Sequence, residues 1–257
     1  FGGRLSSVLE VNMKDGNMKE VHGTANVSIL ASKFMVEGPI VENKASFMLS
    51  GRRTYIDLIV NPIIASINKQ DPDITTDPRY FFYDLNGKVN WRVGERDRVY
   101  LSFFNGKDDF GLASTERFGV SQSSIDFGLD WFNSVAAARW NHEWTPKLFS
   151  NLTVTRSEYT FNTGIEFSET ENTASDSTTQ QINSLYRSGI VDHAARMDFN
   201  YALNNAHYLR FGGNMTLHRF NPGATTFQAE FGQEFPGIDT TLGAEKVRST
   251  EQFLYIE

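Results

Sequence analysis

The chain has 257 residues, enough for a large apolar core, and 24 Lys and Arg against 31 Asp and Glu give it a net charge of −7. An acidic balance without a basic excess gives no indication of a nucleic-acid partner. Cysteine is absent, which excludes disulfides, thiolate metal sites and cysteine nucleophiles. The five histidines do not fall at metal-ligand spacings, so we expect no metal site among them.

Apolar runs are too short for a membrane-spanning helix. The longest of them, such as Leu58 to Val60, are broken at once by polar residues or proline, whereas such a helix needs about 20 apolar residues. Two classes remain: a soluble all-β protein, or a membrane β-barrel, whose closed sheet satisfies every backbone hydrogen bond in lipid. The aromatic share of 13% favours the barrel.

The first segment reads FGGRLSSVLEVNMKDGN, residues 1–17, in which a Gly-Gly-Arg turn leads into an apolar strand that stops at Lys14-Asp15-Gly16. A turn and a strand with no leader before them lead us to expect a piece of a longer chain. After this segment we expect two short strands, bent near Leu30 to Lys33, because an even number of crossings should precede the short turn that begins at Glu42.

Alternation of apolar and polar residues dominates the rest of the chain. Between Leu85 and Val93 the odd positions are apolar or glycine and the even positions are polar, which predicts a strand with two different faces. By the same pattern we expect ten strands, over 19–29, 32–41, 45–58, 80–93, 98–110, 125–144, 147–163, 183–203, 207–220 and 247–257. Alternation alone leaves open whether the apolar face meets a soluble core or lipid.

The connections are of two kinds. Short turns at 42–45, 94–98, 144–147 and 203–207 alternate with long connections at 59–80, 106–124, 163–183 and 221–246. This sorting is typical of outer-membrane barrels. We expect SETENTASDSTT, residues 168–179, to be a mobile, solvated loop, and Asn61-Pro62 to cap and begin a short amphipathic helix on the barrel rim.

Three stretches resemble TonB-dependent outer-membrane receptors, in the form common among Bacteroidota. Residues 1–17 resemble the end of their plug domain. VEGPI and ASFMLSGRRTYID, within 36–57, resemble their first periplasmic turn and third barrel strand, and residues 134–159 resemble a later hairpin. The resemblance implies the end of a plug domain at 1–17 and the first part of a transmembrane antiparallel β-barrel at 18–257. The family's barrel has 22 strands, and this sequence would hold about ten of them.

The resemblance also implies a function: TonB-dependent uptake of a nutrient across the outer membrane of a Gram-negative bacterium. Implied partners are the inner-membrane TonB complex, lipid and lipopolysaccharide, surface lipoproteins, and a small-molecule, peptide or glycan cargo. The sequence departs from the family pattern by not including the TonB box, nearly all of the plug and the second half of the barrel, which we expect in a longer chain. Two alternatives stay open: a structural or adhesive barrel that serves as a platform for surface partners, and a soluble β-sandwich.

Candidate site residues are chosen by their charge and by whether they stand at odd or even positions along a strand. We expect Arg4 and Arg52 to pair with acidic partners and hold the plug against the barrel, with ordinary lumen polarity as the alternative. We expect Arg53 to lie near a membrane interface. Adjacent strand residues face opposite ways, so the following polar residues are expected to face the lumen: Asn86, Lys88, Asn90, Arg92, Arg139 and Asn141.

Other residue patterns give weaker candidates. The carboxylates of Asp71, Asp73 and Asp77 form a candidate calcium loop, with a solvated acidic loop as the alternative. Trp91, Trp140 and Trp144 are expected to form an interfacial girdle. No catalytic motif is present, so we expect no enzyme activity and no cofactor.

Overall fold

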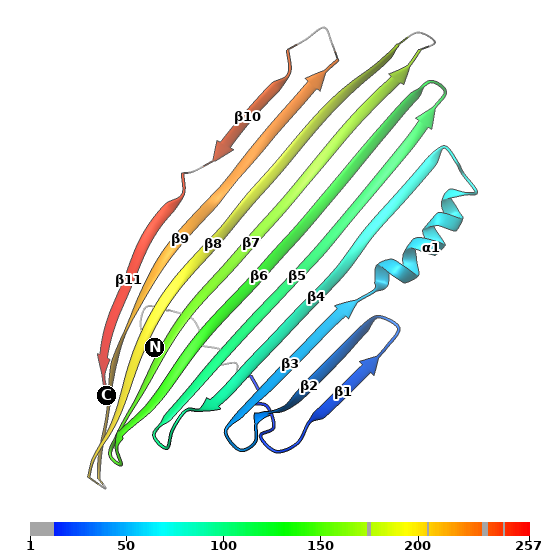
Figure 1. Cartoon of the computed structure of the whole chain (residues 1–257). Helices are drawn as coiled ribbons and strands as arrows, with labels where there is room; N and C mark the ends of the chain where they lie inside the picture. Colours follow the sequence, from blue (N-terminus) through cyan, green and yellow to red (C-terminus); the bar gives the residue numbers. More distant parts are fainter. Residues whose placement is uncertain (1–12, 174–175, 205, 233–235, 244) are drawn as a thin grey trace.

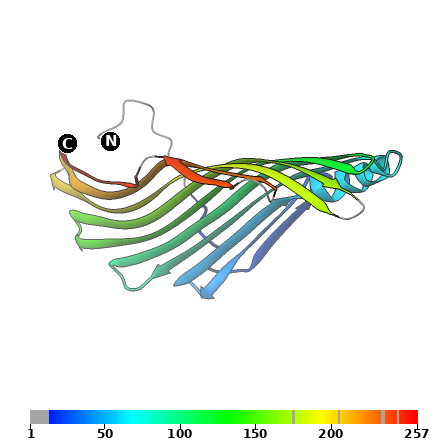
Figure 2. The ribbon, with the colours of Figure 1, turned by 90° about the horizontal axis from the view of Figure 1, so that it is seen from above.

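The computed structural model describes residues 13–257 except 174–175, 205, 233–235 and 244, and this part forms one antiparallel sheet of eleven strands with one helix (Figure 1). Figure 2 shows the sheet bent into an open trough. The strands are β1 His22–Val27, β2 Ala31–Val41, β3 Ala45–Thr54, β4 Ile74–Arg92, β5 Asp97–Phe118, β6 Ser121–Thr145, β7 Leu148–Asn172, β8 Ser177–Asn204, β9 His207–Phe231, β10 Ile238–Gly243 and β11 Val247–Ile256. The all-β prediction is confirmed.

The expected bend in residues 18–41 is present. β1 ends at Val27 and β2 begins at Ala31, and the Ser28 amide and hydroxyl both donate to the Ala31 carbonyl oxygen, at 3.0 and 2.9 Å. Each neighbouring pair of strands from β1 to β9 is joined antiparallel in chain order. The order of strands inferred from the short turns is therefore observed.

The predicted long connections are wrong in three of the four places, because the strands run on through them. β5 continues to Phe118 and turns through Gly119, whose φ is +60°, and Val120 into β6. Likewise, β7 continues to Asn172 and β8 begins at Ser177. The predicted connection at 221–246 contains the end of β9 and all of β10. The pattern seemed to stop because the apolar side chains change between odd and even positions partway along β5 to β8. In β9 a register shift opposite Arg187 to Gly189 changes the face instead.

The stretch SETENTASDSTT is also strand where it is described, except at Thr173 and Asp176 in the turn. Thr170 pairs with Thr179, and their hydroxyl oxygens lie 3.1 Å apart, while the Ser177 hydroxyl donates to Asn172 Oδ1 at 2.9 Å. Backbone ladders need no apolar side chains, and threonine suits a pleated strand. Polar composition therefore did not exclude a hairpin here.

The helix α1, Ile56–Asn68, begins earlier than predicted and contains Pro62 in its interior. The predicted strand 45–58 accordingly ends at Thr54. Asn61 does not cap the helix, because it lies in the helix interior. With its amide oriented so that the nitrogen faces the neighbouring carbonyl oxygens, this nitrogen donates to the carbonyl oxygen of Pro78 in β4 at 3.0 Å. Within the described residues, no helix has the length and apolar character to cross a membrane.

α1 lies along the part of β4 that β3 leaves unpaired (Figure 1). The side-chain amide of Asn68 pairs with the β4 backbone there as a neighbouring strand would. Its nitrogen donates to Thr76 O at 2.8 Å, and its oxygen accepts from Thr76 N at 3.1 Å. Thr54 makes the same kind of contact lower down, where its hydroxyl accepts from Phe82 N at 2.8 Å. Side chains spaced seven residues apart, at 54, 61 and 68, thus cover an open strand edge.

β9 has two partners along its free edge. β10 pairs with residues 224–229 of β9, and β11 pairs with residues 211–220. Between them, Gly223 has a φ of +127° and lies against the ring of Tyr186. β10 and β11 therefore follow the same edge of β9 one after the other (Figure 1).

Candidate functional site: the inner face of the sheet

The two faces of the sheet are distinguished by residues 13–17, which lie against only one of them. Lys88 of β4 donates to the carbonyl oxygen of Met13 at 2.8 Å and pairs with Asp15 at 2.6 Å. We call the face that carries Lys88 the inner face and the opposite face the outer face. Because directly paired residues of neighbouring strands share a face, the register assigns every strand residue to one of the two.

All six side chains predicted to face a lumen lie on the inner face. Lys88 pairs through Ser102 with Ala137, and Asn90 pairs through Tyr100 with Arg139. The lower half of this face, toward the bottom of Figure 1, is polar on β4 to β9. We call this region the inner polar band: Asn86, Lys88, Asn90, Arg92, Arg98, Arg139, Asn141, Thr153, Arg196, Asp198 and Asn214. That the band lines a lumen stays a prediction.

The segment 13–17 docks on this band through ion pairs and close backbone contact. Lys14 Nζ lies 2.5 Å from Glu37 Oε1, and Glu37 is only 4% exposed. Asp15 Oδ2 accepts a hydrogen bond from Asn90 at 3.4 Å and lies 3.9 Å from Arg98 Nη2. A buried carboxylate requires a cation beside it, so Lys14 is held in place by Glu37.

Three basic side chains lie around the ring of Tyr100. The Arg139 guanidinium carbon lies 4.2 Å from the ring centroid, and the Arg98 carbon and Lys88 Nζ lie 5.2 and 5.4 Å from it. Tyr100 is 8% exposed. An aromatic face attracts cations, and so it allows three of them to share one small region next to Asp15.

Sequence reasoning missed both Asp15 and Tyr100. The signal for Asp15 was its place between a lysine and a glycine, since Gly16 is the residue that permits the close approach: a Cβ there would lie 2.0 Å from the carbonyl oxygen of Phe47. Tyr100 gave no such signal, because its role depends on the register between β4, β5 and β6.

Of the two arginines expected at a plug contact, Arg4 and Arg52, the structure describes only Arg52. Arg52 pairs with Asp84 of the neighbouring strand at 2.6 Å and lies over the ring of Phe82. Arg4 lies outside the described residues, so a joint role for these two arginines stays a prediction. Arg53, on the outer face, lies 3.3 Å from Asp57.

The three carboxylates of the candidate calcium loop are spread over two elements. Asp71 and Asp73 lie in the turn after α1, where the Asp73 amide donates to Asp71 Oδ1 at 3.3 Å, and Asp77 lies within β4. Within the part of the chain that the structure describes, no group of three His, Cys, Asp or Glu side chains could hold a metal ion. The solvated acidic loop is the interpretation that fits this arrangement.

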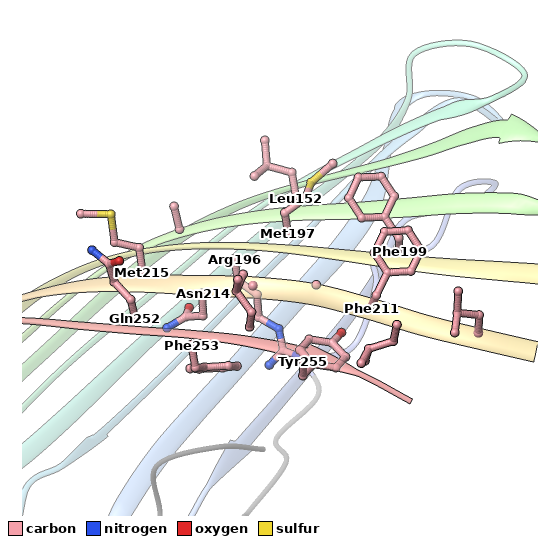
Figure 3. Close-up of a pocket in the computed structure, with 16 residues that line it drawn as sticks. Leu152, Arg196, Met197, Phe199, Phe211, Asn214, Met215, Gln252, Phe253 and Tyr255 are labelled. Atoms are coloured by element: carbon pink, nitrogen blue, oxygen red, sulfur yellow. The ribbon is translucent and has the colours of Figure 1, made fainter.

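The outer face of the lower half carries apolar side chains that remain exposed. Leu101 is 51% exposed and Val154 is 49% exposed. We call this region the outer apolar band: Trp91, Leu101, Phe103, Trp140, Leu152, Val154, Met197, Phe199, Phe211, Met215, Leu217 and Leu254. Figure 3 shows the contrast between the faces on β7 to β11, with Leu152 and Met197 on one side of the ribbon and Arg196 and Tyr255 on the other.

Tryptophans mark the lower edge of the outer apolar band. Trp140 Nε1 donates to Asp97 Oδ1 at 2.8 Å, and Trp144 Nε1 donates to Ser150 Oγ at 3.0 Å. Their rings flank His142, with centroids 5.5 and 4.5 Å from its ring centroid. An amphipathic ring with its N–H satisfied suits a boundary between apolar and polar surroundings.

In the upper half of the sheet the polar and apolar faces are reversed. The outer face there carries ion pairs, including Arg79 with Asp126 at 2.8 Å and Lys107 with Asp109 at 2.7 Å. The inner face becomes apolar, and Phe110 makes edge contacts with Tyr80 and Phe127. We call the latter region the inner aromatic field: Tyr80, Phe110, Leu112, Phe127, Leu129, Phe161, Ile165, Tyr186 and Phe227.

Comparison with known protein families, curated proteins and solved structures gave no match. The function inferred for this chain therefore depends on its residues and its register.

Proposed function

We propose that this chain forms part of the wall of a TonB-dependent outer-membrane transporter, together with the end of its plug, and that the transporter takes up a nutrient. The observation that carries the proposal is the lower half of the sheet. Its outer face is apolar yet exposed, while its inner face is polar and carries a docked segment. A soluble sandwich would bury its apolar face against a second sheet, whereas the described residues form one sheet.

The height of the outer apolar band agrees with a membrane. The apolar positions of the outer face run from Leu85 of β4 to Val93, the residue after this strand. This is a stretch of about nine residues, or about 30 Å at about 3.3 Å per residue. Strands of membrane barrels tilt by about 40°, which reduces this length to about 23 Å, against about 25 Å for the apolar band of such barrels. The charged outer face of the upper half would then lie in water outside the membrane.

The inner aromatic field gives the proposed transporter a surface for cargo. It lies above the inner polar band, on the same face as the docked segment, and the residues that define it carry no formal charge. Aromatic rings offer contact area with little loss of conformational entropy. A cargo with apolar patches or flat rings fits this field better than a highly charged one.

A platform for surface partners is the second candidate, and α1 favours it. Ile59, Ile63 and Ile67, spaced four residues apart along one side of this rim helix, are 39%, 57% and 54% exposed. An exposed apolar stripe of this kind can bind another protein. Such a function would need no energy from the inner membrane.

Uptake separates the two candidates. Cells with and without the intact protein are grown on a complex medium, and solutes lost from the medium are identified by mass spectrometry. The transporter predicts at least one solute whose depletion requires the protein and stops when a protonophore collapses the inner-membrane gradient. Equal depletion by both strains, combined with altered surface adhesion, would support the platform and contradict the transporter.

A further inference from the structure

On the inner polar band, the single carboxylate of Asp15 faces three basic side chains. Lys88, Arg98 and Arg139 lie around the ring of Tyr100, and we call these three side chains the Tyr100 cation cluster. The Lys88 and Arg98 side chains are partly buried. Three positive charges against one carboxylate leave an excess of positive charge, and such an excess attracts a further anion.

The other carboxylates of this region are engaged elsewhere. Glu37 Oε1 lies 2.5 Å from Lys14 Nζ, and Asp198 Oδ1 accepts from Arg196 Nε at 2.9 Å. Arg139 Nε is buried and has no hydrogen-bond partner among the described residues. A buried donor without an acceptor costs free energy, so Arg139 would gain from an anion placed beside it.

Asp15 fills the place of that anion only in part. Its carboxylate lies 2.6 Å from Lys88 Nζ, but it is 3.9 Å from Arg98 Nη2 and accepts from Asn90 at 3.4 Å. Charge-assisted hydrogen bonds are usually about 2.7 to 2.9 Å long. Asp15 is fixed to the chain, whereas a free anion can adjust its position to bind both Arg98 and Arg139.

A hollow of about 510 Å³ beside the cluster gives a ligand room to enter. Its upper part is lined by Arg92, Arg98 and Tyr100, and its lower part, near the turn between β4 and β5, is lined by Glu95, Asp97 and Glu143. An anion in the hollow is repelled by the carboxylates and attracted by the arginines. The charges of the hollow therefore direct an anion toward the Tyr100 cation cluster.

We propose that the Tyr100 cation cluster binds an anionic group of the cargo, a carboxylate or a phosphate, and that Asp15 occupies this place until the cargo displaces it. Arginine forms bidentate hydrogen bonds with both groups. This inference rests on the proposed function and adds the class of cargo, which carries an acidic group. By linkage, the anion and the docked segment weaken each other's binding by the same factor.

The first measurement is a calorimetric titration of the intact protein in a neutral detergent with succinate, and with dimethyl succinate as the uncharged probe. Asp15→Asn should bind succinate about tenfold more tightly than the wild type, because the undocked population is about tenfold larger, and misfolding does not produce a gain of affinity. Arg139→Gln should bind it about tenfold more weakly, since a charge-assisted contact is lost. Arg187→Gln, an equal charge change on the outer face, should bind like the wild type.

The second measurement observes the segment itself, because loss of a nearby negative charge would by itself raise the affinity for an anion. Amine-reactive labelling of Lys14 with mass spectrometry reports on docking, since the pair with Glu37 holds only while the segment is docked. Saturating succinate should speed the labelling of Lys14 severalfold in the wild type and leave it unchanged in Arg139→Gln. Labelling of Lys69, in the turn after α1, is the reference and should not change.

Three results would overturn the proposal. Equal affinity of the wild type and Arg139→Gln for succinate would show that the cluster is not the site. Equal binding of succinate and its dimethyl ester would show that charge is not recognised. Succinate binding that leaves the labelling of Lys14 unchanged would place the anion beside the docked segment and not in the place of Asp15.

Uptake decides whether the anion belongs to the cargo or is a free small anion. The solutes whose depletion requires the protein should carry a carboxylate or phosphate, and their depletion should slow in cells with Arg139→Gln but not in cells with Arg187→Gln. If such solutes are found and none is an anion, the cargo assignment is wrong and the proposed function stands. If no solute depends on the protein, the proposed function itself is wrong.

Discussion

Asp15 is the residue that connects the docked segment to the inner polar band. Its carboxylate meets Lys88, Asn90 and Arg98 at once, while Gly16 beside it allows the backbone to approach β3. The Lys88 side chain is 12% exposed. A partly buried ammonium group depends on its acceptors more than a surface lysine does.

The change Asp15→Asn should release Lys88. Loss of the ionised partner weakens the contact by about 1 to 2 kcal/mol, which corresponds to an increase of about tenfold in the undocked population. Amine-reactive footprinting with mass spectrometry measures this directly, as faster labelling of Lys88. Asp71→Asn, which removes an exposed carboxylate far from the segment, is the matched control. Identical labelling of Lys88 in both variants would show that Asp15 does not hold the segment.

At the scale of elements, α1 covers the edge of β4 that has no neighbouring strand. The upper part of β4 lacks a neighbouring strand on one side, and exposed strand edges promote pairing with other chains. Thr54, Asn61 and Asn68 bind backbone groups of β4 at regular intervals. Pro78 needs no donor partner, because proline has no N–H.

Asn68→Ala should open this edge. The variant loses two hydrogen bonds to Thr76, at an expected cost of about 1 to 3 kcal/mol in local stability. Hydrogen exchange of the β4 peptide around Thr76 should become about tenfold faster or more. Lys69→Ala, the next residue along the chain, should leave exchange unchanged. Equal acceleration in both variants would mean that the helix as a whole, and not the Asn68 amide, protects the edge.

At the scale of the whole molecule, the exchange of faces divides the sheet into two zones. In the lower zone the outer face is apolar and the inner face is polar, and in the upper zone the assignment is reversed. Along β5 to β8 this reversal shifts the apolar positions by one residue, and along β9 a register shift against β8 has the same effect. A sheet with one apolar face from end to end would suit a soluble core, whereas two zones suit two different surroundings.

Spin labels at single cysteines test the two zones, and the absence of native cysteine leaves no background. Val154→Cys and Asp126→Cys both lie on the outer face, one in each zone. After reconstitution in lipid, the label at 154 should be accessible to oxygen and protected from a water-soluble nickel complex, and the label at 126 should show the reverse. Thr155→Cys, on the inner face of the lower zone, is the control for a polar surrounding. Similar accessibility at 154 and 126 would contradict the membrane boundary.

The sequence by itself determined the all-β class, the short turns, the bend before β2 and the parity of the six polar residues on the inner face. These features depend on local chemistry: alternation assigns faces within one strand, and turn residues end it. It did not predict the length of β5 to β8, because a change of the apolar residues between odd and even positions looks the same as the end of a strand. It did not predict the length of β9, because Pro222 and Gly223, which usually end a strand, lie inside it. Only the tertiary structure decided which residues meet across strands, as Asp15 meets Lys88 and Tyr100 collects its cations. The physical reason is that register is set by many ladder hydrogen bonds acting together, and no single stretch of sequence contains both sides of a pair.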